Sequence, residues 1–417
     1  MSAKRRSAIW TDRAAQQTVA AVNHVNGSVA PSCPWQRRGN RTTRVSSMQQ
    51  GAMKPKPRTT GGAITVVRRL DGIDVSRLAN LSLNENAWGT VPGAVAAAAD
   101  AAAHASLYAD TRSWALREAI GAFYGVDPAC VVPGNGSEEI LDIAGRVYAR
   151  PGDEILAPAL SFAQFRIVAW RLGVDYVESP TTGQLDVDLD AMIAAITPRT
   201  RVIFLANPGN PTGRAVSGAE LIRLADSVPG NVLLVLDCAY AEFGDAEAGA
   251  VAMRLAQERP NVLTTRTFSK AWGLAGMRLG WSVATREVAD ALNAMRGIGN
   301  VSGPAQMAGI AGMRHAETPA WLDQTLAKVI RARELLTGGL RQAGFEVPVS
   351  HTNFVMARVP SDAGFHAGDV VRRVAEAGVL IRACDDYGLD DWLRISAGLD
   401  GPMRSVIETM TDMAIRG

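Results

Sequence analysis

Between about residue 80 and residue 300, short and continuously apolar segments alternate with segments of helical periodicity. The apolar runs lie near 154–157, 201–206, 231–236, 262–265 and 279–283, and the helical stretches near 95–105, 114–124, 138–148, 163–172, 189–196 and 218–226. A strand that is apolar at every position is buried on both faces, which is typical of parallel sheets covered by helices. The alternation therefore predicts an α/β fold with a mostly parallel central sheet.

The pattern changes after about residue 300. One long amphipathic helix is expected over 319–343, followed by shorter strands near 353–357, 379–382 and 393–396. This order of secondary-structure elements predicts a smaller α+β domain. We therefore expect a large domain over 83–305 and a small domain made of 61–82 together with 306–417.

The beginning of the chain differs from the rest in composition. Residues 1–52 contain eight Lys and Arg residues, one acid (Asp12) and no hydrophobic periodicity. We expect 1–60 to be a basic, disordered extension. An organellar transit peptide, a basic arm that contacts nucleic acid, and an artefact of start-site choice at a chain that truly begins at Met53 are the alternatives. Disorder or an artefactual extension is favoured over targeting.

The remainder of the chain holds 35 of the 43 basic residues and 40 of the 41 acidic ones. This mild acidity does not favour a nucleic-acid partner. No apolar run is long enough to span a bilayer, so no membrane association is expected. The cysteines are scattered without a CxxC pair, which argues against a metal site or a disulfide framework and favours a reducing compartment such as the cytoplasm. They are Cys33, Cys130, Cys238 and Cys384.

The segment Thr267-Phe-Ser269-Lys270 carries the strongest chemical signal. Lys270 lies beside two hydroxyl residues, and Arg278 follows eight positions later. An amine that forms a Schiff base with a phosphorylated aldehyde needs such partners, because hydroxyl groups and a guanidinium bind phosphate. The apolar start of the preceding segment indicates a strand that delivers Lys270 to a crowded site. We favour this interpretation over a surface lysine in a polar loop.

A glycine-rich turn, Gly134-Asn-Gly136, follows an apolar segment and opens a helix. The free N–H groups at a helix N-terminus bind phosphate, and glycine lets the ligand approach the backbone closely. We expect the amides of Ser137 and Glu138 to serve in this way. An ordinary N-cap explains the turn equally well when it is considered alone.

Three further segments place polar or aromatic side chains where strands end. Asn210 lies in a turn with two Asn-Pro steps, one of which could be cis, at the edge where open α/β sheets bind ligands. Asp237 ends an apolar strand, so its burial requires a cation or donor such as a protonated pyridine nitrogen. Tyr240 would donate to the phenolate oxygen of the same ring. Phe162 would stack on that ring, although core packing is the commoner role of a phenylalanine.

The ordered motifs GNGSEE, NPGNPTG, DCAY, TFSKAWGLAGMRLG and LRISAG resemble those of the class I/II, fold-type I pyridoxal-phosphate aminotransferases. With the opening Leu83-Asn-Glu-Asn86, the chain is most similar to the histidinol-phosphate aminotransferase family. The resemblance runs from about residue 80 to the C-terminus. It implies a homodimer with shared active sites, bound pyridoxal 5'-phosphate, and transfer of an amino group from L-histidinol phosphate to 2-oxoglutarate. The products would be imidazole acetol phosphate and L-glutamate.

The resemblance also assigns roles to the residues that match the family's motifs. Lys270 would carry the cofactor and move the proton, Asp237 would keep the pyridine nitrogen protonated, and Asn210 and Tyr240 would hydrogen-bond the ring oxygen. Phe162 would stack on the ring. The phosphate would be bound by the Ser137 and Glu138 amides, Thr267, Ser269, Arg278 and, from the partner subunit, Tyr108.

At the substrate end, the resemblance implies that Arg394 binds an anionic group and that Arg382 serves phosphorylated amines. Asn86 and Trp88 would line the substrate pocket. The chain departs from the family pattern at Ala87-Trp88, where Pro-Tyr or Pro-Phe is usual, and at Ala109, where proline is usual. Cys238 replaces the usual glutamate.

The departures at the pocket rim bear on substrate identity. The bulky indole of Trp88 suits an aromatic amino-acid aminotransferase as an alternative. A decarboxylase of phosphothreonine would use the same two arginines. A non-catalytic, cofactor-binding regulator is disfavoured because Lys270, Asp237 and Arg394 are all present.

Overall fold

The structure, a computed structural model, describes Leu70, residues 72–183 and residues 185–416. The expected basic extension over 1–60, with the alternatives for its origin, lies outside these residues. The described residues all belong to one compact unit. The boundaries expected between a large and a small domain stay a prediction.

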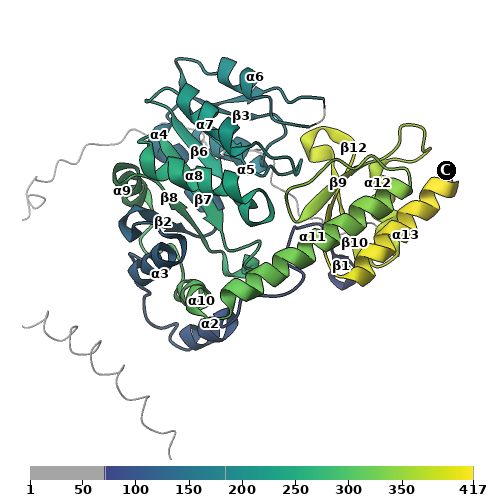
Figure 1. Ribbon diagram of the computed structural model, residues 1–417, viewed down its shortest axis with the longest axis horizontal. Helices are drawn as coiled ribbons and strands as arrows, with labels where there is room; N and C mark the ends of the chain where they lie inside the picture. The colour runs from purple at the N-terminus through teal and green to yellow at the C-terminus, as the bar shows by residue number, and fades with distance from the viewer. Residues whose placement is uncertain (1–69, 71, 184, 417) are drawn as a thin grey trace, which may run out of the picture. The chain divides into compact units, whose positions relative to one another are not determined.

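A seven-stranded sheet forms the larger layer, with strand order β2-β8-β7-β6-β5-β3-β4 (Figure 1). Only β8 runs antiparallel to its neighbours; the other pairings are parallel. The prediction of an α/β fold with a mostly parallel sheet is confirmed. The strands are β2 (Val131–Gly134), β3 (Glu154–Pro158), β4 (Asp175–Ser179), β5 (Thr200–Ala206), β6 (Leu233–Asp237), β7 (Val262–Thr267) and β8 (Gly280–Val283).

Helices cover both faces of this sheet, which explains why its strands are continuously apolar. In β6, Leu233 and Val235 join one hydrophobic cluster, whereas Leu234 and Leu236 join another on the opposite face. The first cluster includes residues of α4 (Ser137–Tyr148), α5 (Ala163–Leu172) and α9 (Arg286–Met295). The second includes residues of α2 (Ala94–Ala102), α3 (Trp114–Tyr124), α6 (Leu189–Ala194), α7 (Gly218–Ser227), α8 (Ala246–Glu258) and α10 (Gly303–Arg314).

The C-terminal elements build two smaller sheets and three helices. An antiparallel sheet has the order β11-β12-β9, and β1 pairs with β10 in a two-stranded parallel sheet. The strands are β1 (Ala79–Asn80), β9 (Phe354–Arg358), β10 (Val379–Leu380), β11 (Arg382–Cys384) and β12 (Leu389–Ser396). The helices are α11 (Thr318–Gln342), α12 (Ala367–Glu376) and α13 (Asp400–Arg416). The long α11 contacts α10 and the 3₁₀ helix at Ala241–Phe243 as well as β9 and α13, so it joins the large sheet's layer to the C-terminal elements (Figure 1).

Five short 3₁₀ helices complete the described elements. They are η1 (Val75–Arg77), η2 (Pro128–Cys130), η3 (Ala241–Phe243), η4 (Ala275–Met277) and η5 (Asp385–Tyr387). Of these, η3 and η5 carry residues next to functional motifs.

Several elements were not anticipated from the sequence. The edge strand β4 has only one buried residue, Ser179, so it lacks the continuous apolar pattern of its neighbours. Helix α8 is rich in alanine, which gives weak contrast between its buried and exposed faces. Helices α9, α10, α12 and α13 were also not expected. The predicted long helix was confirmed with its bounds displaced by one residue, as α11.

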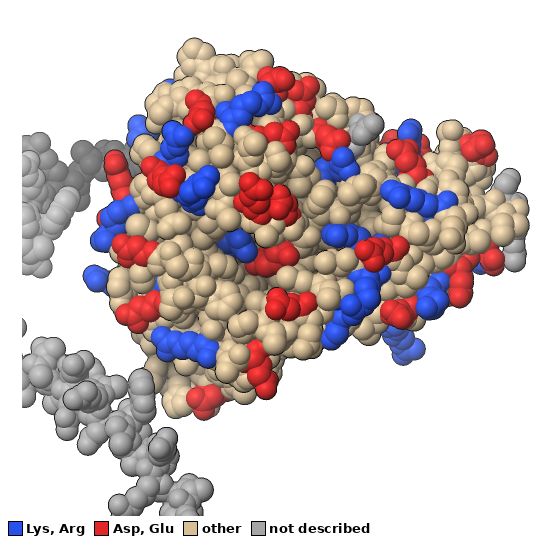
Figure 2. Space-filling model, viewed as in Figure 1, with Lys and Arg blue, Asp and Glu red and all other residues tan. Residues whose placement is uncertain are grey.

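Among the described residues, no helix has the length and apolarity needed to cross a bilayer. The face shown in Figure 2 carries acidic and basic side chains interspersed over its surface.

Candidate active site

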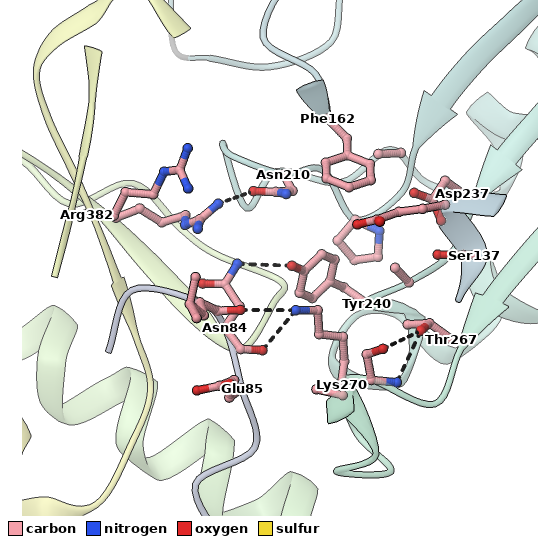
Figure 3. A pocket seen from close by; sticks show the side chains of 18 of the residues that line it. Asn84, Glu85, Ser137, Phe162, Asn210, Asp237, Tyr240, Thr267, Lys270 and Arg382 are labelled. Carbon is pink, nitrogen blue, oxygen red and sulfur yellow. Dashed lines mark hydrogen bonds between the residues drawn. The ribbon is translucent and has the colours of Figure 1, made fainter. Parts of the chain in front are cut away.

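The functional motifs meet at one edge of the seven-stranded sheet. Strands β5, β6 and β7 run parallel, so their carboxyl ends lie together, and the loops that follow them carry Asn210, Tyr240 and Lys270. A cavity of about 380 Å³ opens there (Figure 3). The predicted site residues that line it are Ser137, Glu138, Phe162, Asn210, Asp237, Tyr240, Thr267, Ser269, Lys270, Arg278, Arg382 and Arg394. The cavity therefore brings together most of the expected ring-binding residues and the two arginines expected at the substrate.

The N-terminus of α4 forms one wall of the cavity together with the loop after β7. Ser137 opens the helix after Gly136, which has a left-handed φ of 80°. The Thr267 hydroxyl donates to Ser269 Oγ at 3.0 Å, and Arg278 lies across from them with Nη2 3.5 Å from Glu138 Oε2. Hydroxyl, guanidinium and helix N–H donors thus face one another in a small space, which suits a phosphate.

Glycine is required at two positions because the α4 N-terminus and the residues after β7 lie very close to each other. A Cβ atom on Gly136 would lie 2.8 Å from Arg278 Nη2, and one on Gly280 would lie 2.4 Å from the backbone nitrogen of Ser137. Any side chain at these positions would displace the donors. Gly136 in the turn and Gly280 on β8 therefore allow Arg278 and the Ser137 N–H to approach closely, as the predicted anion site requires.

Asp237 lies at the end of β6 and is 3% exposed. Its Oδ1 accepts a hydrogen bond from Thr265 Oγ1 at 2.8 Å. Burial raises the pKa of Asp237 to about 6, despite the hydrogen bonds from Thr265 and Ala239 that lower it. A buried carboxylate whose ionised form is disfavoured is stabilised by a neighbouring cation, and a protonated ring nitrogen in the cavity would provide one.

Lys270 reaches across the cavity from the loop after β7. Its Nζ donates to the carbonyl oxygens of Leu83 and Asn84, at 3.3 and 3.1 Å, and lies 5.5 Å from the centre of the Tyr240 ring (Figure 3). The accepting carbonyls belong to residues 82–86, which we call the strap. The amine is thus held inside the cavity by a segment distant in the sequence.

Two arginines from the C-terminal sheet close the other end. Arg394 on β12 is 5% exposed and donates to Asn210 Oδ1 at 2.6 Å and to the Ser82 carbonyl at 2.9 Å, while its buried Nε has no partner in the structure. Arg382 on β11 is paired with Asp386. Because Arg394 occupies the amide oxygen of Asn210, the Asn210 NH₂ group remains to donate into the cavity.

Three predicted site residues do not line the cavity. Asn86 donates to the Ala271 carbonyl at 3.0 Å and accepts from the Trp88 backbone at 3.0 Å, so its side chain fixes the end of the strap. Trp88 is partly buried against the hydrophobic core. Tyr108 is fully exposed on this chain. Asn86 and Trp88 therefore differ from the expectation that they line the substrate pocket, because local hydrogen bonds engage the first and core packing the second.

Other cavity residues were not among the predicted site residues. Asn84 is 2% exposed with φ 57°, and its Nδ2 donates to the Tyr240 hydroxyl at 3.0 Å. Tyr387, on η5, lines the cavity beside Arg382. The sequence signal for Asn84 was its place in the Leu-Asn-Glu-Asn segment. Tyr387 carried no signal, because it belongs to none of the motifs.

The donor set fits the phosphorylated pyridine aldehyde that the motifs predict. Hydroxyl and guanidinium donors, a buried acid and an amine line one cavity, and Arg394 lines it as well. Both Asn-Pro bonds of the turn that holds Asn210 are cis, at Pro208 and Pro211, where at most one was expected. Within the described part of the chain, no cluster of three or more His, Cys, Asp or Glu residues could hold a metal ion.

Comparison with known proteins agrees with this geometry. Residues 76–408 match the family described as aminotransferase class I and II. A histidinol-phosphate aminotransferase from Jannaschia sp. (strain CCS1) is 39% identical over 84% of this chain and 94% of its own length. One from Rhodospirillum rubrum is 38% identical over 82% and 91%.

Solved structures are similar as well. A crystal structure of histidinol-phosphate aminotransferase from Sinorhizobium meliloti, in complex with pyridoxal-5'-phosphate, has a TM-score of 0.75 and 27% identity, covering 81% of this chain and 91% of that one. An aspartate aminotransferase double mutant from Thermus thermophilus has a TM-score of 0.72 at 24% identity and supports the fold alone.

Proposed function

Since the chain belongs to the class I and II aminotransferases, and within them to the histidinol-phosphate aminotransferase family, we propose that it transfers the amino group of L-histidinol phosphate to 2-oxoglutarate. The products are imidazole acetol phosphate and L-glutamate. The observation that carries the proposal is the placement of Arg382 and Arg394 in one cavity with Lys270 and a phosphate-sized donor cradle. We place this activity in histidine biosynthesis in the cytoplasm.

The enzyme uses pyridoxal 5'-phosphate, which supplies an aldehyde that condenses with amines and a ring that accepts electrons. The N-terminus of α4, with Thr267, Ser269 and Arg278, would bind the phosphate. Asp237 would hold a proton on the ring nitrogen, and its own burial penalty would fall as it gains that partner. Phe162 would cover one face of the ring.

Lys270 would move the proton. Its Nζ lies in the cavity, held by two strap carbonyls, and would remove the proton from the amine-bearing carbon of the substrate. A lysine that serves as a base must reach the substrate proton with its Nζ, whereas here Nζ donates to the two strap carbonyls. Release of Nζ from the strap would therefore accompany loading of the site.

The two arginines supply charge for the substrates. L-histidinol phosphate carries a phosphate, and 2-oxoglutarate carries two carboxylates, so both need cationic groups at the far end of the cavity. Arg394, which lines the cavity, would bind an anion of either substrate. Arg382 would bind the phosphate of the amine or the distal carboxylate of the acceptor.

We further propose a homodimer that shares its active sites. Large apolar side chains are exposed on one face near Tyr108, including Leu107 at 72% and Ile298 at 92%. The loop that bears Tyr108 packs on the segment that bears Ile298, since Arg296 donates to the Thr111 carbonyl at 3.0 Å and Gln306 donates to the Asp110 carbonyl at 3.0 Å. Such a patch is typical of an interface between subunits.

Subunit complementation tests the shared site. Lys270→Ala and Tyr108→Ala homodimers are each expected to be impaired, but a refolded mixture would contain hybrid dimers with one site that has both residues intact. We expect activity to reappear in the mixture. A mixture no more active than the sum of its parts, or a protein that sediments as a monomer, would refute the shared site.

The substrate assignment is tested by single-turnover absorbance of the cofactor-loaded protein. We expect L-histidinol phosphate at low concentration to remove the visible band of the bound cofactor and to yield pyridoxamine phosphate. A response to phenylalanine alone would instead identify an aromatic amino-acid aminotransferase. Release of carbon dioxide from phosphothreonine without an amino acceptor would identify a decarboxylase.

A further inference from the structure

Asn84 forms a chain of hydrogen bonds that joins the C-terminal sheet to Tyr240. The Asn84 backbone N–H donates to Ser396 Oγ at 2.9 Å, and the same hydroxyl donates to Asn84 Oδ1 at 3.1 Å. On its other side, Asn84 Nδ2 donates to the Tyr240 hydroxyl oxygen at 3.0 Å. All three residues are at most 5% exposed, so water does not compete for these groups.

The polarity of this chain decides where the Tyr240 proton points. A hydroxyl has one proton, and an amide NH₂ group can only donate. Because Tyr240 accepts from Asn84, its own proton must be directed elsewhere, and Tyr240 lines the cavity (Figure 3). Were the Asn84 amide reversed, Tyr240 would donate to it, and the Ser396 proton would lose its only acceptor among the described residues.

We propose that Ser396 and Asn84 form a positioning relay that directs the Tyr240 hydroxyl proton into the cavity, toward the ring oxygen of the cofactor. This inference rests on the proposed function, which gives Tyr240 that oxygen as its acceptor. Asn84 is a positioning residue, since it acts on the cofactor through Tyr240. The Tyr240 hydroxyl can both donate and accept hydrogen bonds, and the relay makes it a donor with one fixed direction.

The backbone at Asn84 explains why asparagine suits this role. Its φ of 57° lies in the left-handed region, which asparagine, aspartate and glycine adopt at lower cost than other residues. The Asn84 carbonyl also accepts from Lys270 Nζ at 3.1 Å and from Asn353 Nδ2 at 3.0 Å. When Lys270 leaves the strap on loading of the site, the bond from Asn353 remains and holds the Asn84 amide in place against Tyr240.

Substitution of Asn84 by aspartate reverses the polarity of the relay. A carboxylate can only accept, so Tyr240 would donate to it and its proton would leave the cavity. A donor to the ring oxygen stabilises that oxygen's anionic form. Its loss is therefore expected to raise the midpoint of the pH-dependent change in the cofactor's visible spectrum by about one to two pH units.

The experiment is a spectral pH titration of the cofactor-loaded protein with a double-mutant cycle. We expect Asn84→Asp and Tyr240→Phe each to raise the midpoint and Asn84→Gly, which keeps the left-handed backbone without adding charge, to raise it less. Neither Asn84 variant should add to the shift of Tyr240→Phe. Asn80→Asp is the matched control, because Asn80 caps Ser82 in the same part of the chain and does not touch Tyr240.

The outcomes separate this inference from the proposed function. A wild-type protein without a visible, pH-dependent cofactor spectrum would refute the function itself. An Asn84→Asp shift that persists in the Tyr240→Phe background would show direct electrostatics and overturn the relay. Unchanged midpoints in both Asn84 variants would overturn it as well, and Asn84→Gly keeps the test decisive if the aspartate variant does not fold.

Discussion

The two ends of the cavity are assembled in different ways. At the ring end, Thr267 and Ser269 are two residues apart in the chain, and Asp237 bonds to Thr265 on the adjacent strand. At the substrate end, Arg394 bonds to Asn210 across 184 residues of sequence. Most ring-end residues therefore lie on strands of one sheet or in the loops that follow them, with α4 and the strap completing the wall. The substrate end exists only where the strap, the Asn-Pro turn and the C-terminal sheet meet.

This difference implies that the ring end determines the reaction, whereas the substrate end determines which substrates are accepted. A site carried by adjacent strands of one buried sheet keeps its geometry when other parts of the chain shift. A site assembled from distant segments changes with small displacements of any of them. We expect substitutions at the ring end to abolish the reaction and substitutions at the substrate end to change which anions are accepted.

The largest effect is expected for Lys270→Ala at the ring end. Loss of the amine removes both the cofactor anchor and the proton carrier, so kcat should fall by a factor of about 10⁴ or more, with loss of the visible band of the lysine-bound cofactor. Single-turnover absorbance and steady-state rates measure both. Lys328→Ala on α11, outside the cavity lining, is the control and should match the wild type. Retained colour and turnover in the Lys270 variant would contradict the assignment.

Burial of the Asp237 carboxylate at the ring end lowers the free energy of unfolding, and this effect can be measured without the cofactor. Burial raises the pKa of Asp237 from its ordinary 3.8 to about 6, which corresponds to about 3 kcal/mol. With a raised folded-state pKa, this carboxyl lowers stability as pH rises from about 4 to about 6, and the loss persists above that range. Asp237→Asn should therefore unfold at higher urea concentration than the wild type at pH 7 when both lack cofactor.

Urea unfolding at pH 4 and pH 7 provides the control for this prediction. The advantage of Asp237→Asn should become small at pH 4, where the wild-type carboxyl is protonated in the folded state and only about half ionised in the unfolded state. The same variant should lose catalysis, because asparagine cannot hold the ring nitrogen protonated. Equal stability of the two proteins at pH 7 would mean that the buried charge is already compensated.

At the substrate end, Arg382→Gln should change selectivity more than chemistry. The substitution removes the positive charge and the paired N–H donors of the guanidinium, so kcat/KM for L-histidinol phosphate should fall by about 10- to 100-fold relative to unphosphorylated L-histidinol. The ratio of the two kcat/KM values is the measurement. Arg358→Gln, on β9 of the same sheet and exposed, is the matched control. An unchanged ratio would count against a phosphorylated donor.

The smallest effect is expected at the ion pair between Arg382 and Asp386. Asp386 is the more exposed partner, and its charge offsets that of the arginine inside the cavity. Asp386→Asn should lower KM for the phosphorylated donor about two- to fivefold with kcat unchanged, in keeping with the modest strength of partly exposed pairs. Asp385→Asn, one residue earlier and exposed, is the control. A higher KM would show that Asp386 positions Arg382 instead.

Most of the fold and of the ring end could be predicted from the sequence. Asp237 follows the apolar run of β6, and Lys270 follows that of β7, so each residue could be placed at the carboxyl edge of a buried sheet. The predicted strands and the long helix appear close to their expected bounds. Edge strand β4 was missed because a half-exposed strand lacks the apolar run on which such predictions depend.

The substrate end was readable only in part. The motif that contains Arg394 was recognised, but its bond to Asn210 and the pairing of Arg382 with Asp386 were not. Asn86 was expected in the pocket, yet its side chain is consumed by local hydrogen bonds.

The sequence by itself determined the sheet, the order of its motifs and the residues that follow each strand, because hydrophobic periodicity and strand ends are local properties. Only the tertiary structure decided that Asn84 faces Tyr240 and Ser396, and that the strap holds Lys270. Asn84 and Ser396 lie 312 residues apart in the chain. Their contact depends on how the strap and the C-terminal sheet pack together, and no local pattern of residues encodes that distance.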